Sequence, residues 1–275
     1  MFDLEQFPRD LQTSRRHLVK VGGLVATALL ASAASLRPAA ARDPRGGCDG
    51  DGDEDDRHCC FLKGTVIETI KGPRVIEELA VGDMLPTVFG GARPVRWIGR
   101  TSHKKDDPLR PWARGLLPVR IARSALGPGV PHTDLYVTRS HALFIDGILM
   151  QAGSLLNGTT ITIDEARERN ELSYFHIKLE AHDVIYAQGA LCESMLNVDA
   201  NAANFSDYLE RYGAPVPDET PCVPIMSAGG RSELRSRLRS AAAPWIDRRQ
   251  QRDIVRDRLE ERAIMLSPQS SQSTL

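Results

Sequence analysis

Apolar and polar positions alternate in short stretches between residues 60 and 190, a pattern typical of half-buried β-strands. The stretch Thr65–Ile70 is rich in β-branched residues, and Lys71-Gly72-Pro73 bounds it. The expected strands are Thr65–Ile70, Arg74–Leu79, Pro94–Gly99, Leu117–Ile121, Leu135–Thr138, Ala142–Ile145, Ile148–Met150, Tyr174–Leu179 and Asp183–Ala187. Between two of them lies Asp146-Gly147, a strong signal for a two-residue hairpin turn. The pattern therefore predicts an all-β domain.

The character of the chain changes after about residue 200. We expect a helix over Asn204–Tyr212, then a Pro-rich connector and an Arg-rich helical tail, together residues 201–275. An apolar stripe in the tail predicts an amphipathic helix that ends at Ser267-Pro268. Its members are Val255, Leu259, Ala263 and Leu266. The stripe either packs on the β domain or contacts a membrane or partner, and we expect the chain up to Met226 to fold without it.

The N-terminal residues predict an export signal. Arg15-Arg16 precedes the apolar stretch Val21–Leu36, and Ala39–Ala41 provides an A-x-A cleavage site. The stretch is too short and too rich in small residues for a good membrane span. The arginine pair resembles the bacterial twin-arginine signal, with an ordinary secretory signal as the alternative. We therefore expect a signal peptide over 1–41, an acidic linker over 42–59, and export to the periplasm or beyond.

Composition narrows the function classes. The chain has 275 residues, a net charge of -1, 41% hydrophobic, 26% charged and 5% aromatic residues. These values exclude wholesale disorder and coiled coil, and they argue against a nucleic-acid partner. The charge is uneven, because the segment 227–275 holds ten arginines and no lysine. This tail is expected to make at most a weak contact with a membrane or an acidic partner.

The cysteines are the first candidate functional residues. The five are Cys48, Cys59, Cys60, Cys192 and Cys222. In an exported chain disulfides are possible, but an odd number leaves at least one thiol over. No Cys-x-x-Cys pair is present, so a zinc ribbon is not expected. No metal or organic cofactor is expected for the single-turnover reaction described below.

Three separated motifs form an ordered set. The first is Cys60-Phe61 with Gly64-Thr65 and the later Val81-Gly82-Asp83, and the second is Thr138-x-x-His141. The third is the segment Lys178–Gly189, which contains Ala181-His182. The set resembles the Hint family, the autoprocessing domain that Hedgehog C-terminal regions share with inteins. The resemblance covers about residues 60–200 and implies a horseshoe-like, pseudo-twofold β domain, followed here by the helical extension.

The chemistry of these residues agrees with that resemblance. A thiol next to a peptide bond can attack the preceding carbonyl, here that of Cys59, and form a thioester. By resemblance, Cys60 is the nucleophile, His141 the acid for the leaving amide, and Thr138 the residue that orients the scissile peptide. We expect a partly exposed, polar site for Cys60, because the thiolate is the attacking form. An alternative is that Cys59 is the nucleophile.

Three further residues have open roles. His182 is either a packed histidine or a secondary proton donor. Asp183 is expected to be a solvent-facing turn residue, with a base for an incoming nucleophile as the alternative. Cys192 is expected to be structural.

The chain also departs from the family pattern. An intein needs a terminal His-Asn, and no His-Asn occurs here, so protein splicing is not expected. The expected function is cleavage or acyl transfer at the Cys59-Cys60 bond, with the chain's own N-terminal segment as substrate and water, a thiol or an amine as the resolving nucleophile. Two alternatives stay open: a catalytically silent interaction module, and a Cys/His peptidase that acts on other chains.

Overall fold

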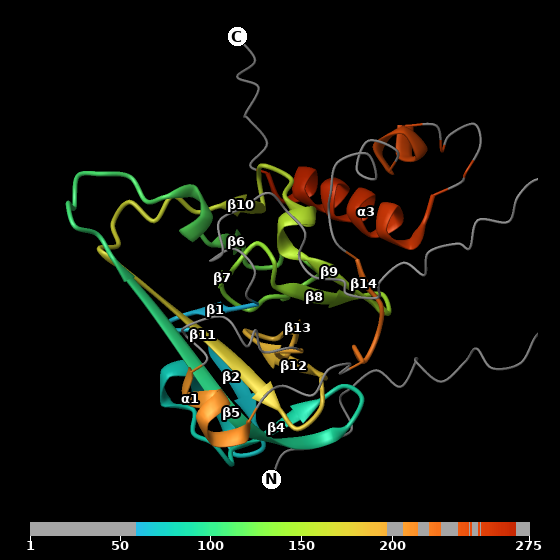
Figure 1. Ribbon diagram of the computed structural model, residues 1–275. Coiled ribbons are helices and arrows are strands. Elements are labelled where there is room, and N and C mark those ends of the chain that lie inside the picture. Colours follow the sequence, from blue (N-terminus) through green and yellow to red (C-terminus); the bar gives the residue numbers. More distant parts are fainter. Residues whose placement is uncertain are drawn as a thin grey trace, which may run out of the picture. The chain divides into compact units, whose positions relative to one another are not determined.

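The fold was analysed in a computed structural model, shown in Figure 1. The residues it describes are 59–196, 206–213, 220–226, 236–241, 243, 247 and 249–267, all within the unit Pro44–Leu275. The expected signal peptide and nearly all of the acidic linker lie outside the described residues, as do residues 197–205. None of the described helices is long and apolar enough to cross a membrane.

Fourteen strands in the described part of the chain form one hydrogen-bonded network. Their bounds are β1 Phe61–Leu62, β2 Val66–Thr69, β3 Gly72–Val75, β4 Met84–Thr87, β5 Gly91–Lys104, β6 Val119–Ile121, β7 Leu135–Val137, β8 Ala142–Ile145, β9 Ile148–Gln151, β10 Ile161–Ile163, β11 Glu171–Leu179, β12 Val184–Ala187, β13 Ala190–Glu193 and β14 Ile225–Met226. Short 3₁₀ turns and two bounded helices complete the elements: η3 Ile76–Glu78, η4 Arg114–Leu116, η5 Ala152–Leu155, α1 Ser206–Tyr212 and α3 Gln251–Leu266. This architecture confirms the all-β prediction and its helical C-terminal part.

Strand pairing shows how distant segments reach one another. The order along the network is β10-β6-β7-β1-β11-β5-β4-β12-β13-β8-β9-β14, and β2 pairs with β12 and β3. The two long strands β5 and β11 lie side by side over most of their length (Figure 1). The short strand β1 lies between β7 and β11, with Phe61 opposite both Val137 and Phe175. The start of β1 is therefore enclosed from both sides.

The β8–β9 hairpin follows its sequence signal. Asp146 has φ +49° and Gly147 has φ +87°. Positive φ at both central positions is the conformation that a tight hairpin turn requires, and Asp-Gly adopts it readily. The turn brings Ala142, next to His141, opposite Gln151.

The C-terminal helix α3 packs into the main core. Val255 is 0% exposed and Leu259 1% exposed, and both belong to the same apolar cluster as Phe61, Ile145 and Ile148. Ala263 is buried as expected, but Leu266, at the end of the helix, is 43% exposed. The apolar stripe is thus covered by the protein's own β domain. Truncation after Met226 would remove two core side chains, so this packing argues against the expectation that residues up to Met226 fold alone, which stays a prediction to be tested.

Candidate functional site

Cys60 lies immediately before β1 and is enclosed by its neighbours. It is 4% exposed and packs with Leu62 and Trp112. The expectation of a partly exposed site is therefore wrong for this residue. The physical reason is the central position of β1, since the flanking strands β7 and β11 cover its entry.

Both ends of the Cys59–Cys60 peptide bond contact side chains. The amide N–H of Cys60 donates a hydrogen bond to Thr138 Oγ1 over 3.0 Å. The carbonyl oxygen of Cys59 lies 3.2 Å from His176 Nδ1. The thiol of Cys60 lies against the same imidazole, with Sγ 3.4 Å from Nδ1 and 3.5 Å from Nε2. The Cys60 thiol, the Cys59 carbonyl and the Cys60 amide are thus gathered around two side chains, His176 and Thr138.

A tight turn explains the spacing of the Thr138-x-x-His141 motif. The N–H of His141 donates to the carbonyl of Thr138 over 3.2 Å, which closes the turn. The N–H of Thr138 donates to the carbonyl of Cys60 over 3.0 Å, and the N–H of Ala152 donates to the carbonyl of His141 over 2.8 Å. The turn therefore stands at the end of β7, beside the start of β1. Because only two residues separate Thr138 from His141, this one turn directs both side chains toward the Cys59–Cys60 peptide.

His141 is buried without a hydrogen bond on its ring. It is 1% exposed, and neither Nδ1 nor Nε2 has a hydrogen-bond partner among the described residues. Its ring packs edge-on against Phe61, with centroids 4.3 Å apart. Burial lowers the pKa of His141 to about 4, an effect that the negative charge of Glu193 and the carbonyl of Cys59 partly oppose. At neutral pH the ring is therefore uncharged and has unused capacity to accept a proton.

His182 joins the site through Glu193. The His182 side chain is fully buried, and its Nδ1 accepts a hydrogen bond from the N–H of Cys222 over 3.0 Å. Its Nε2 lies 3.7 Å from Glu193 Oε2. The other oxygen, Glu193 Oε1, accepts the N–H of Ala142 over 2.6 Å. His182 is a packed histidine in this arrangement, and within the described residues its ring contacts Cys222 and Glu193 rather than the Cys59–Cys60 peptide.

Asp183 corrects the sequence prediction most clearly. It is 0% exposed rather than solvent-facing. Its Oδ2 accepts from Thr87 Oγ1 over 3.0 Å and from Arg93 Nε over 2.8 Å. Its Oδ1 accepts from the N–H of Phe89 over 3.0 Å and from that of Val184 over 2.8 Å. Four donors use the whole acceptor capacity of this carboxylate, so Asp183 ties β4 and β5 to β12 and has none left for a nucleophile.

His176 and Glu193 are the two site residues that sequence reasoning missed. His176 lies inside the expected strand Tyr174–Leu179, where it reads as one more buried position, and the ring of Trp97 stacks over it at 6.3 Å. The signal that would have identified His176 is the register between β1 and β11. Phe175 pairs with Phe61, and His176 is therefore opposite Cys60. Glu193 reads as a polar strand end.

The remaining cysteines fit structural roles. Cys192 is 0% exposed, and burial raises the pKa of its thiol well above the ordinary value. Cys59 is half-buried, and its Sγ lies 3.7 Å from the carbonyl oxygen of Ser140. No disulfide joins any two of the four described cysteines.

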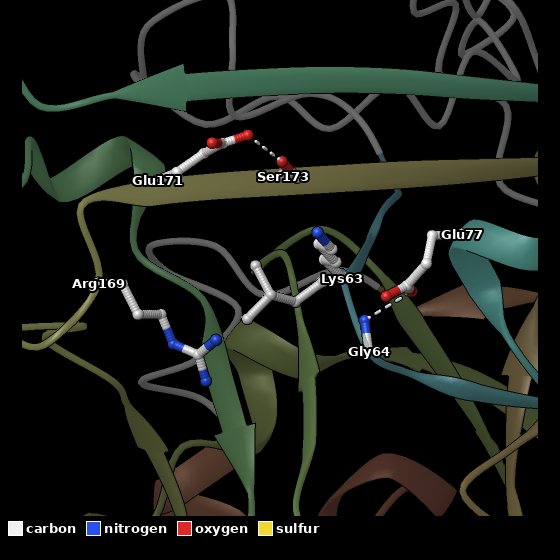
Figure 2. Close-up of a pocket in the computed structure, with 7 residues that line it drawn as sticks. Lys63, Gly64, Glu77, Arg169, Glu171 and Ser173 are labelled. Carbon is white, nitrogen blue, oxygen red and sulfur yellow. Dashed lines mark hydrogen bonds between the residues drawn. The ribbon is translucent and has the colours of Figure 1, made fainter.

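A separate pocket lies beyond the other end of β1 (Figure 2). It has a volume of about 370 Å³ and is lined by Leu62, Lys63, Gly64, Glu77, Arg169, Glu171 and Ser173. Glu171 and Ser173 alternate with His176 along β11, so they belong to the opposite face of that strand. The pocket contains none of the side chains that contact the scissile peptide. Within the described ranges, no group of three or more His, Cys, Asp or Glu side chains is arranged to hold a metal ion.

Residues 59–199 match the family model of the Hint domain. This match covers more than half of the chain, and the chain therefore belongs to the Hint domain family. The membership supports a domain of the autoprocessing or splicing type. No curated protein matches the chain.

Solved structures with similar folds are inteins and an intein-like domain. A gp41-1 intein is 16% identical, with 49% of this chain and 98% of that chain covered and a TM-score of 0.35. The DnaB intein from Synechocystis sp. PCC 6803 is 11% identical, with coverage of 50% and 99% and a TM-score of 0.36. A bacterial intein-like domain from Clostridium thermocellum is 13% identical, with coverage of 49% and 97% and a TM-score of 0.35.

Proposed function

We propose that this chain is a self-cleaving Hint domain that breaks its own Cys59–Cys60 peptide bond through a thioester. One observation carries the proposal: the Cys60 thiol, the Cys59 carbonyl oxygen and the Cys60 amide are all in contact with His176 or Thr138, at 3.0 to 3.5 Å. A nucleophile, a carbonyl to attack and a hydrogen bond to the leaving nitrogen are the requirements of an N-to-S acyl shift.

The first step joins Cys60 Sγ to the carbonyl carbon of Cys59. His176 accepts the thiol proton, because its ring lies against Sγ. The resulting thiolate supplies the electron pair of the new C–S bond, and the electrons of the carbonyl move onto its oxygen. The imidazolium of His176 then faces the negative oxygen, from which Nδ1 is 3.2 Å away in the resting state. Opposite charges at this distance in a buried site stabilise the tetrahedral intermediate.

The second step breaks the C–N bond between Cys59 and Cys60. The nitrogen leaves only after it gains a proton, and His141 supplies it. The Cys59 oxygen lies beside both rings, so the thiol proton held by His176 passes through that negatively charged oxygen to His141, and His141 gives it to the nitrogen as the carbonyl re-forms. Thr138 holds the nitrogen in place through its hydroxyl. The products are a Cys59 thioester on Cys60 Sγ and a new amino group.

Resolution of the thioester releases the N-terminal segment. Water, a thiol or an amine adds to the Cys59 carbonyl, and the Cys60 thiolate leaves. The reaction happens once per chain. Because Cys60 and His141 are 4% and 1% exposed, a peptide from another molecule has no access to them without displacement of the residues around Cys59. This burial favours action in cis over the alternative of a peptidase acting in trans.

Intact-mass spectrometry of the full chain tests this function. Incubation with dithiothreitol should produce two fragments that separate between Cys59 and Cys60, and Cys60→Ala should abolish them. Cys59→Ser is the matched control: it should cleave at nearly the wild-type rate, because only the carbonyl of that residue reacts. Cleavage that survives in Cys60→Ala and disappears in Cys59→Ser would move the nucleophile by one residue. A wild-type chain that stays intact for days in thiol would overturn autoprocessing in favour of a silent module.

Export is proposed separately, on the N-terminal residues alone. The pair Arg15-Arg16 before an Ala-rich apolar stretch supports a twin-arginine route out of a bacterial cytoplasm. Replacement of both arginines by lysine should leave the precursor in the cytoplasm, as measured by cell fractionation. Undiminished export of that variant would indicate the general secretory route.

A further inference from the structure

Glu193, the last residue of β13, is a buried carboxylate that the steps above do not use. It is 3% exposed, and the described groups that face it are His141, His182 and the side chain of Cys59, with the thiols of Cys192 and Cys222 further out. Burial alone raises a carboxyl pKa, yet these neighbours and the Ala142 amide hold the pKa of Glu193 below its ordinary value. A negative charge therefore persists beside the reaction centre.

Hydrogen bonds fix this charge in place. Glu193 Oε1 accepts the N–H of Ala142 over 2.6 Å, and Ala142 directly follows His141 in the chain. The carboxylate thus holds the backbone at the end of the Thr138-x-x-His141 turn. A short bond from a backbone amide to a buried carboxylate is charge-assisted, which makes it stronger than a neutral hydrogen bond.

His182 supports the same carboxylate from the other side. Its Nδ1 accepts the N–H of Cys222, so the proton of the neutral ring is on Nε2. Nε2 is the atom that faces Glu193 Oε2, at 3.7 Å. The donor, Cys222, comes from the segment just before β14, which lies beyond the part of the chain that matches the Hint domain model. The C-terminal extension therefore contributes to the surroundings of the site.

We infer that Glu193 is a positioning residue for self-cleavage: it anchors His141 through Ala142, favours a proton on the His141 ring, and faces a His182 ring that the Cys222 backbone orients. The inference rests on the proposed function of the Cys59–Cys60 bond. It gives His182 an indirect role, as a group that holds the carboxylate rather than a proton donor to the substrate.

The negative charge of Glu193 matters because a buried His141 would otherwise seldom carry the proton that it must donate to the leaving nitrogen. Burial is the main cause that lowers its pKa, to about 4 in the presence of Glu193, and Glu193 is the charged side chain that opposes this effect. Without the charge, a smaller fraction of His141 carries the proton that the leaving nitrogen needs. The rate at a fixed pH above that pKa should fall in proportion to this fraction.

Glu193→Gln tests the inference in the full chain, since it removes the charge and keeps the shape. We expect cleavage to slow by about 10- to 100-fold, and the pH–rate profile to shift to lower pH. Asp183→Asn is the matched control, the same chemical change at a second buried carboxylate near β12, and its folded fraction should cleave at about the wild-type rate. A merely structural role for Glu193 would lower the yield of folded protein and leave the pH–rate profile in place.

A measurement independent of cleavage separates this inference from the proposed function. In the Cys60→Ala chain, NMR titration should give a lower His141 pKa with Glu193→Gln than without it. An unchanged pKa would overturn the inference, whereas a lowered pKa in a protein whose wild type never cleaves would overturn only the proposed function. If Glu193→Gln does not fold, Glu193→Asp is tested in its place. The shorter side chain keeps the negative charge but places it farther from His141, so cleavage should slow by about 3- to 10-fold. Wild-type cleavage together with an unchanged His141 pKa in Glu193→Asp would then overturn the inference.

Discussion

Asp183 and His141 are equally buried polar side chains, but their surroundings differ in one respect. Asp183 is 0% exposed and accepts four hydrogen bonds, whereas His141 is 1% exposed and its ring nitrogens have no partner in the part of the chain described. A buried polar group with all its partners stabilises the fold, and one without partners weakens it. A reaction, however, requires unused hydrogen-bonding capacity. The comparison therefore indicates a structural role for Asp183, and it supports the proposed chemical role of His141.

The largest effect should come from His141→Phe. This variant keeps an aromatic ring against Phe61 and removes both ring nitrogens. Loss of a general acid should slow cleavage by about 10²- to 10⁴-fold. Stability at neutral pH should stay level or rise by about 1 kcal/mol, because two unpartnered buried atoms disappear. Mass spectrometry measures the cleavage rate, and urea unfolding measures the stability. A His141→Phe chain that is both slow and much less stable would contradict the distinction between the structural Asp183 and the chemical His141.

Asp183→Asn should show the opposite pattern. The variant removes the carboxylate 2.8 Å from Arg93 Nε and leaves Arg93 with Glu180 alone, at 3.4 Å from its Nη1. Removal of one member of a buried ion pair costs about 3–5 kcal/mol. Urea unfolding should record this loss, while the folded fraction cleaves within about threefold of the wild-type rate. A 100-fold loss of rate in folded Asp183→Asn protein would revive the alternative that this carboxylate acts on an incoming nucleophile.

These two residues also show how far the sequence could predict the site. Thr138 and His141 could be predicted because they lie three residues apart in a recognisable motif, and one tight turn brings them together. Asp183 was expected to be a turn residue because its partners on β4 and β5 are 96 and 90 residues away in the chain. His176 was missed for the same reason, since its contact with Cys60 depends on the pairing of β1 with β11.

The fold was more predictable than the site because its signals are local. Asp146-Gly147 fixed the β8–β9 hairpin, and alternation located β2, β5 and β11 to within a few residues. Short strands such as β1 and β14 have two residues each and carry no periodicity. The expected position of the tail helix was correct, but the sequence left open whether its apolar stripe packs on the β domain or on a membrane or partner, because a stripe does not reveal which surface covers it.

A third variant tests whether instability alone stops cleavage. Leu259 is 1% exposed in the core contact of α3, and it is absent from the contacts around the scissile bond. Leu259→Ala should cost about 2–5 kcal/mol in urea unfolding through the cavity it leaves. Its folded fraction should cleave at the wild-type rate, as expected for Asp183→Asn. Leu266→Ala is the control on the same helix, with a 43% exposed side chain and an expected change below about 0.5 kcal/mol.

The smallest effect is an acid sensitivity that should belong to His141. Its pKa is about 4 in the folded chain against 6.5 for an unperturbed histidine, so between these values the unfolded chain binds one more proton than the folded chain. Stability is therefore complete above pH 6.5 and is lost as the pH falls toward 4, by up to about 3 kcal/mol. Urea midpoints at pH 7 and pH 5 should diverge in the wild type and converge in His141→Phe, after the common contribution of the acidic residues is subtracted. Equal acid sensitivity in both proteins would mean that His141 keeps an ordinary pKa, and that its ring is better solvated than its lack of partners implies.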